Sequence, residues 1–261
     1  MKQLLIIPDR RDIQQSLALA GEYGAGFEYN DFYAPDVLDD SGLCQKIADE
    51  YRRLSLPKRQ PCTLHGAFYD VIVFSMDRRI REVSDLRIRQ SVKAAENIGA
   101  GAVIFHTNYD PFFSWRSYID GWLDSNEKYW SGILDEYPSM NIYIENMFDR
   151  SPDVMAELAE RLCRYGNFGI CLDYAHAALT PVPHEEWVRK LGKYVRHIHI
   201  NDNDLTGDLH WAVGKGKIDW DGFYRLYNEH MDGASILIET ASYENQRLSL
   251  EKLAADGFIT R

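Results

Sequence analysis

Nine imidazole and carboxylate side chains stand at, or just past, the ends of short apolar segments of the chain. They are His65, His106, Glu145, Asp173, His176, His199, Asp208, His210 and Glu239. Imidazole combined with carboxylate is a ligand set that suits Zn²⁺ or Mn²⁺. Glu145, Asp173 and Glu239 each follow a strongly apolar run, and a buried carboxylate without a partner is costly. A shared divalent cation would satisfy all three, so the sequence predicts a metal site with one to three ions.

The segments that carry these residues read as strands that alternate with helices. Eight short runs rich in Val, Ile, Leu and aromatic residues are expected to be strands: Gln3–Ile7, Ala25–Tyr29, Cys62–His65, Ala102–His106, Asn141–Glu145, Phe168–Leu172, Val195–Ile200 and Ser235–Glu239. Stretches with helical spacing lie between most of them, which implies parallel strands joined by crossover helices. Eight such units in this length predict an α/β fold, a (β/α)₈ TIM barrel. The alternative is an open doubly wound sheet, but no G-x-G-x-x-G follows the first strand.

The helix signals fit the same organisation. A helix is expected to end at Gly99, and another to begin at Ser151, Pro152 and Asp153 and to end near Gly166. No linker or low-complexity stretch divides the chain. A single domain over residues 1–261 is therefore predicted.

Composition narrows the class of function. The chain has 261 residues, a formal net charge of −11 and 45% apolar residues, which is typical of a folded protein. The acidic balance argues against nucleic acid as a partner, because a nucleic-acid-binding protein needs a basic face. The four cysteines show no C-x-x-C spacing. No segment has the length of a membrane span, so a cytoplasmic protein with reduced thiols is expected.

Three motifs carry a resemblance to a known family. C-L-D-Y-A-H, H-I-H-I-N-D-N-D and D-L-H-W-A-V-G-K-G-K-I-D-W are similar to segments of the xylose isomerase-like barrel superfamily, which includes endonuclease IV and many sugar isomerases and epimerases. The resemblance covers nearly the whole chain. For the sugar enzymes it implies one ion held by Glu145, Asp173, His199 and Glu239. For endonuclease IV it implies three zinc ions held by all nine residues named above. In the family's motif, the metal-binding histidine is followed by an apolar residue, Asn and Asp, and this pattern matches His199. His197 is therefore expected to lie one layer deeper in the barrel.

The favoured function is a divalent-metal-dependent sugar or sugar-phosphate isomerase or epimerase. A bound cation would stabilise an enediolate, and Glu145 and Glu239 would move the proton. Some related epimerases carry a further Glu six residues after the first metal ligand, where this chain has Ser151. The expected partner is a small carbohydrate or phosphate ester, and a homo-oligomer is compatible with the sequence.

The alternative function is an endonuclease IV-like zinc phosphoesterase, which the presence of His65 and His106 favours. The stretch Asn30–Asp36 has no Lys or Arg, so a small phosphate ester is expected rather than abasic DNA. A third interpretation is a metal- or sugar-binding barrel without catalysis, since a ligand set alone does not make a catalyst.

Four further residues are candidates for substrate contact. Asn30 and Asn108 follow the second and fourth strands. Trp115 belongs to an aromatic segment that forms either a lid over the site or a helical insertion packed on the barrel. Lys215 lies in Gly-Lys-Gly, which either cradles a phosphate or makes a simple turn.

Overall fold

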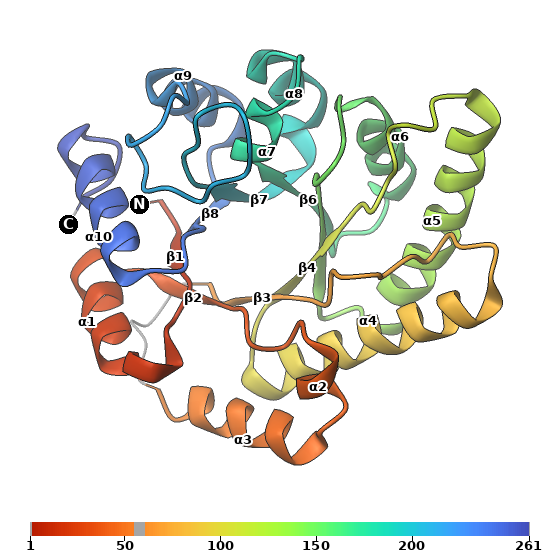
Figure 1. Cartoon of the computed structure of the whole chain (residues 1–261), viewed down its shortest axis with the longest axis horizontal. Coiled ribbons are helices and arrows are strands. Elements are labelled where there is room, and N and C mark those ends of the chain that lie inside the picture. The colour runs from red at the N-terminus through yellow and green to blue at the C-terminus, as the bar shows by residue number, and fades with distance from the viewer. Residues whose placement is uncertain (1, 55–60, 261) are drawn as a thin grey trace.

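Eight parallel strands close into a barrel in which each strand pairs with its neighbours in the sequence (Figure 1). The structure is a computed structural model that describes residues 2–54 and 61–260. The strands are β1 (Leu4–Ile6), β2 (Gly26–Tyr29), β3 (Thr63–His65), β4 (Ala102–His106), β5 (Asn141–Glu145), β6 (Phe168–Asp173), β7 (Val195–Ile200) and β8 (Ser235–Ile238). Pairing of β1 with β8 closes the ring, and this confirms the predicted TIM barrel.

Helices surround the barrel and cover the outer face of the strands (Figure 1). They are α1 (Ile13–Tyr23), α2 (Pro35–Leu38), α3 (Ser41–Arg52), α4 (Arg78–Ile98), α5 (Arg116–Glu136), α6 (Asp153–Leu162), α7 (Tyr174–Ala178), α8 (His184–Leu191), α9 (Trp220–Leu226) and α10 (Tyr243–Ala255). Among residues 2–54 and 61–260, none of the helices combines the length and apolarity that crossing a membrane requires.

Strand register places the ligand-type residues at one level of the barrel. His106 on β4 pairs with Glu145 on β5, and Asp173 on β6 pairs with His199 on β7. These pairs lie at the carboxyl ends of their strands, where parallel barrels build their active sites. The apolar residues of these strands are buried on both faces of the sheet, because helices cover its outer face and side chains fill the barrel interior.

The predicted helix limits are partly corrected. Gly99 adopts a left-handed conformation with φ 79° and caps α4, as expected. However, α6 begins at Asp153 with Pro152 as its N-cap residue, and it ends at Leu162, before Gly166. Ser151 lies one residue before this N-cap position, where its hydroxyl accepts from the Asp153 N–H at 3.5 Å and donates to the Asp153 carboxylate at 2.9 Å.

The aromatic segment after β4 forms helix α5. Trp122 and Trp130 are buried, and the Trp130 ring packs on Phe105 of β4 with centroids 5.3 Å apart. Asn126 links the two residues, because its amide donates to the backbone carbonyl of Trp122 and its oxygen accepts from Trp130 Nε1. This part of the segment therefore packs on the barrel as a helical insertion.

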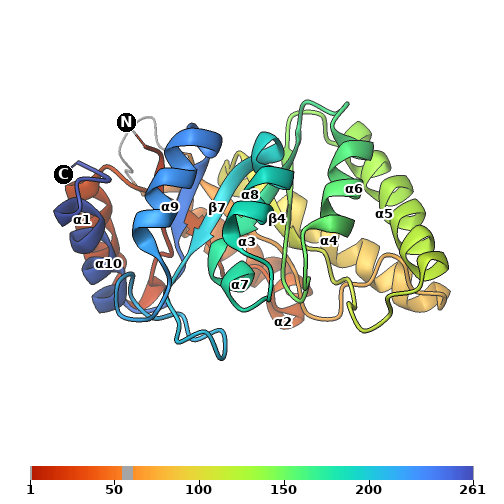
Figure 2. The same ribbon diagram turned by 90° about the horizontal axis from the view of Figure 1, so that it is seen from above.

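A long loop after β7 extends beyond the barrel on the side where α2 and α7 lie (Figure 2). Its anchor is the buried carboxylate of Asp202, which accepts hydrogen bonds from the backbone N–H groups of Gly214 and Ile218 and from Trp220 Nε1. Asp202 and Trp211 also exchange two backbone hydrogen bonds of 2.9 Å. The loop that carries Asp208 and His210 is thereby fixed to the end of β7.

Gly216 allows this loop to close on Asp202. A Cβ atom at position 216 would overlap the Asn203 carbonyl oxygen and Asp202 Oδ1. Replacement of Gly216 by Ala is therefore expected to lower the free energy of unfolding by about 1–3 kcal/mol, measured by denaturant titration. Gly207→Ala is the matched control, since the nearest atom to its Cβ is Leu209 Cδ2 at 4.0 Å. Equal stability of the two variants would contradict this account of the loop.

Candidate metal centre

Four buried side chains meet at the mouth of the barrel. They are Glu145 from β5, Asp173 from β6, His199 from β7 and Glu239 directly after β8, and they offer ligand atoms within 4.8 Å of one another. His199 Nδ1 lies 3.2 Å from Glu145 Oε1 and 3.5 Å from Glu239 Oε2. Three carboxylates and one imidazole are a ligand set that could hold a divalent cation.

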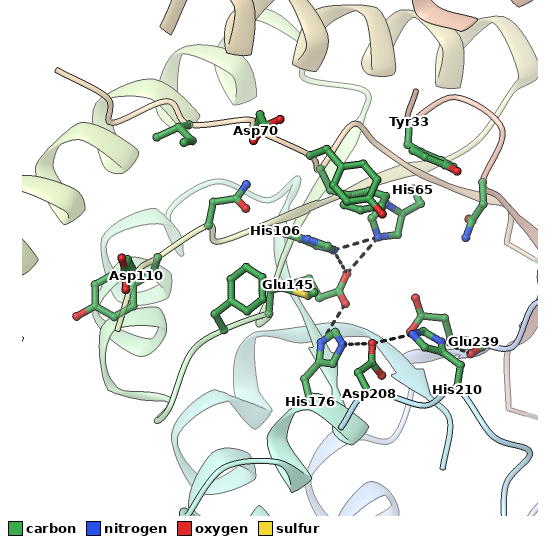
Figure 3. Close-up of a pocket in the computed structure, with 18 of the residues that line it drawn as sticks. Tyr33, His65, Asp70, His106, Asp110, Glu145, His176, Asp208, His210 and Glu239 are labelled. Carbon is green, nitrogen blue, oxygen red and sulfur yellow. Dashed lines mark hydrogen bonds and ion pairs between the residues drawn. The ribbon is translucent and has the colours of Figure 1, made fainter. Parts of the chain in front are cut away.

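A second group adjoins the first and shares Glu145 with it. His65 from β3 and His106 from β4 direct their Nε2 atoms toward each other at 3.2 Å (Figure 3). These atoms lie 3.5 and 3.4 Å from Glu145 Oε2. Glu145 thus directs one carboxylate oxygen toward each group, which is the arrangement of a bridging ligand.

A third group lies beside them and is assembled by the loop after β7. Asp208 Oδ2 lies between His176 Nε2 at 3.3 Å and His210 Nε2 at 2.8 Å (Figure 3). His176 comes from α7, whose N-terminus is capped by the side chain of Asp173. All nine side chains that the sequence singled out therefore meet at one rim of the barrel.

Backbone carbonyls orient three of the histidines. His65 Nδ1 lies 3.0 Å from the backbone carbonyl oxygen of Gly66. In the same way, His176 Nδ1 lies 2.9 Å from the Asn146 carbonyl oxygen, and His210 Nδ1 lies 2.8 Å from the Glu239 carbonyl oxygen. A carbonyl oxygen can only accept, so Nδ1 carries the proton and Nε2 faces the site. Metal-binding histidines are oriented by hydrogen bonds of this kind.

Crowding of like charges perturbs the carboxylates. Burial favours the neutral form of Glu145, but the adjacent imidazoles of His199 and His106 hold the pKa of its carboxyl well below the usual value. Burial, with Asp173 and Glu145 nearby, raises the pKa of Glu239 to about 8. The protein groups alone therefore leave one carboxylate poorly compensated, and a positive charge placed among them would stabilise its ionised form.

The residues fit a bound cation. Eight buried carboxylate or imidazole atoms have no hydrogen-bond partner in the part of the chain that the structure describes, and five of them face the three groups: Glu145 Oε2, Asp173 Oδ2, His176 Nε2, His199 Nδ1 and Glu239 Oε2. Leaving a buried polar group unpaired costs about 1–3 kcal/mol. Because all five atoms belong to the three groups described above, coordination of divalent ions accounts for them together.

An open cavity of about 1090 Å³ leads to the three groups. Asn30 and Asn108, two of the candidate substrate contacts, line it. Trp115 and Lys215 lie outside this lining. Trp115 packs on Phe113 and Tyr118 at the start of α5, and Lys215 is exposed on a turn in which the N–H of Gly214 is already bonded to Asp202.

Sequence reasoning missed Glu28, which is fully buried on β2 directly beneath the site. Glu28 Oε1 lies 3.2 Å from His199 Nε2, and Oε2 lies 3.0 Å from His197 Nε2 and accepts from the Thr63 hydroxyl at 2.7 Å. His197 also contacts the Ser235 hydroxyl, which confirms it as a hydrogen-bonded histidine one layer deeper. The sequence feature that could have indicated Glu28 is a single charged residue within the otherwise apolar strand Gly26–Tyr29, because a buried charge needs a partner.

The family follows from comparison with known proteins. Residues 17–258 match the model of the xylose isomerase-like TIM barrel family. The chain belongs to this family. It is 32% identical over 198 residues to the uncharacterized protein MJ1614 of Methanocaldococcus jannaschii, a match that covers 73% of this chain and 75% of that protein. A match to MJ1311 of the same organism, at 28% identity, covers 60% of this chain and 56% of that relative.

Two similar proteins have named activities, and the crystal of a third was soaked with zinc. A probable endonuclease 4 of Mycobacterium leprae is 29% identical over 195 residues, covering 69% of this chain and 73% of that protein. A structure of L-ribulose 3-epimerase superposes with a TM-score of 0.70 at 14% identity, covering 99% of this chain and 94% of that one. The TTHB071 protein of Thermus thermophilus, from a crystal soaked with ZnCl₂, superposes with a TM-score of 0.75 at 22% identity, covering 98% of this chain and 99% of that one. These structural likenesses show the fold.

Glu145→Gln is expected to remove metal from two groups at once, because Glu145 belongs to both. The measurement is elemental analysis of protein purified without chelator. Glu229→Gln, an exposed glutamate beside His230, is the control and should retain the full metal content. A Glu145→Gln protein with unchanged metal content would show that the site is wrongly assigned.

Glu28→Gln is expected to weaken metal binding about 10- to 100-fold, because Glu28 holds the His199 ring with Nδ1 toward the other ligands. Titration calorimetry with Zn²⁺ measures this directly. Ser235→Ala alters the same buried network through His197 without contacting His199, and it should bind Zn²⁺ like the unmodified protein. If Zn²⁺ affinity fell equally in both variants, Glu28 would have no specific effect on the orientation of His199.

Proposed function

We propose that this barrel hydrolyses phosphate esters with two or three divalent ions bound at its mouth. The observation that carries the proposal is the convergence of three adjoining ligand groups around Glu145 and Asp208. A single-ion site needs only the first group. The Nε2 atoms of His65 and His106, which face each other beside Glu145, are not needed as ligands in a site with one ion.

The charge of the cavity supports the same function. The residues that line it include no Lys or Arg among those the structure describes, and its charged side chains are carboxylates and histidines. A phosphate group would be repelled by Glu145, Asp208 and Glu239 unless cations were bound among them. Bound divalent ions supply this charge, polarise the phosphoryl oxygens and lower the pKa of water. The chain's own residues hold the ions and, through their backbone anchors, fix the direction of the imidazoles.

Sugar isomerisation or epimerisation, which the sequence favoured, is the second candidate. The first ligand group supports it, because Glu145, Asp173, His199 and Glu239 form a complete four-ligand site. Position 151 does not supply a further acid, because it is a serine whose hydroxyl bonds to Asp153. A proton-transfer role would fall to Glu145 and Glu239.

A His65→Ala variant separates the two functions, because His65 belongs to the second group and not to the first. In the unmodified protein we expect two to three zinc ions per chain and hydrolysis of bis(p-nitrophenyl) phosphate that chelator abolishes and Zn²⁺ restores. His65→Ala should lose about one ion per chain and more than about 100-fold in kcat/KM, since the metal clamp on the phosphoryl group would be incomplete.

The control is His230→Ala, which removes a half-exposed histidine far from the cavity lining. One ion per chain in the unmodified protein, with epimerisation of ketoses that survives His65→Ala, would establish the second candidate instead. If the protein bound metal but catalysed neither reaction, the result would support the third interpretation, a binding barrel without catalysis.

A further inference from the structure

One wall of the cavity is a continuous series of aromatic rings that begins at the ligand histidines. The Phe68 ring lies 5.2 Å from the His65 ring and 5.1 Å from the His106 ring, measured between centroids. Tyr69 continues the series at 4.1 Å from Phe68, and Tyr33 lies 5.2 Å from Phe68. A substituent that leaves the metal centre along this wall would contact aromatic faces over its whole length.

The outer end of the cavity has exposed aromatic surface. Tyr69 and Phe148, which both line the cavity, keep 66% and 61% of their surface exposed. Large aromatic side chains at such exposure are available for stacking with a ligand. Asn30 adds a polar contact, because its Oδ1 is shielded from solvent and has no partner among the described residues. An unpaired acceptor in the lining calls for a donor on the ligand.

The charge at the entrance disfavours a polyanion. Asp70 and Asp110 lie in the lining on the side away from His210 and Glu239 (Figure 3). Binding of a nucleic acid strand needs Lys or Arg for the phosphates that flank the reacting one. At this entrance those flanking phosphates would meet carboxylates.

Resting on the phosphoesterase function above, we propose that the substrate is a small ester with a single phosphoryl group and a planar heteroaromatic substituent of nucleoside size. The metal centre takes the phosphoryl group, and the substituent stacks between the wall of Phe68 and Tyr69 and the ring of Phe148. A cavity of about 1090 Å³ is slightly larger than the roughly 300–1,000 Å³ that is typical for small-molecule sites, so it has room for such an ester. In the reaction, the water oxygen forms a bond to phosphorus, the P–O bond to the leaving group breaks with its electron pair, and a water proton passes to the medium or the leaving oxygen.

Two esters with the same leaving group test the proposal on the zinc-loaded protein. Thymidine 5′-(p-nitrophenyl) phosphate and methyl p-nitrophenyl phosphate both release p-nitrophenolate and differ only in the substituent that stays on phosphorus. We expect kcat/KM to be at least about tenfold higher for the thymidine ester, the factor that one stacked base contributes. Tyr69→Ala and Phe148→Ala should each reduce this ratio severalfold or more.

Phe112→Ala is the matched control for these variants. Phe112 is 86% exposed and lies outside the cavity lining, so its loss should leave the ratio unchanged. A ratio near one in the unmodified protein, or a ratio insensitive to Tyr69 and Phe148, would overturn the substrate class while the phosphoesterase function stands.

An oligonucleotide duplex with one abasic site completes the comparison. Its cleavage with a higher kcat/KM than the thymidine ester would also overturn the substrate class, in favour of nucleic acid. A zinc-loaded protein that hydrolyses none of the three compounds would overturn the phosphoesterase function itself.

Discussion

Negative charge concentrated at the mouth of the barrel is the constraint on which the rest of the site depends. Glu145, Asp173 and Glu239 are buried within reach of one another, and Asp208 lies close by. Carboxylates that share a buried site repel one another strongly. Five histidines surround them, yet buried ligand atoms remain without partners among the described residues. Additional positive charge would stabilise the ionised carboxylates, and the groups at the point where the cavity meets the strands could hold a divalent cation that supplies it.

The fold meets this constraint by two separate means. Strand register brings His106 beside Glu145 and Asp173 beside His199, so these ligands depend on the rigid barrel. Asp208 and His210 come from a loop, which the buried Asp202 fixes to the end of β7 through backbone and indole hydrogen bonds. His210 adopts a left-handed backbone conformation with φ 48°, a strained geometry for a residue other than glycine. The loop thus positions Asp208 and His210 through the hydrogen bonds of Asp202.

Beneath the ligands, a buried layer determines which way the imidazoles face. Glu28 contacts both histidines of β7 across the barrel interior, and Thr63 and Ser235 complete its network. Burial disfavours the charge on Glu28, but His199 and His197 hold the pKa of its carboxyl far below the usual value. Glu28 Oε1 lies 3.2 Å from His199 Nε2, so His199 directs Nδ1 toward the site. The choice of ring nitrogen therefore depends on a residue that touches no substrate.

The sequence by itself determined the fold, the family and all nine ligand-type residues. This was possible because strand ends of a parallel barrel meet at one rim, so a polar residue after each apolar run falls at the same place. Residues two apart on a strand share a face, and the resemblance to the family motif then identified His197 as the deeper of the two histidines.

Only the tertiary structure decided how the nine residues divide into groups, and that Glu145 is common to two of them. It also decided the start of α6 at Asp153, the role of Asp202 and the contact of Glu28 with His197, 169 positions away in the chain. Trp115 and Lys215 could not be placed from spacing, and both lie outside the cavity. The physical reason is the same in each case: periodicity gives the face of a strand or helix, whereas contacts between distant elements depend on register, loop closure and side-chain direction.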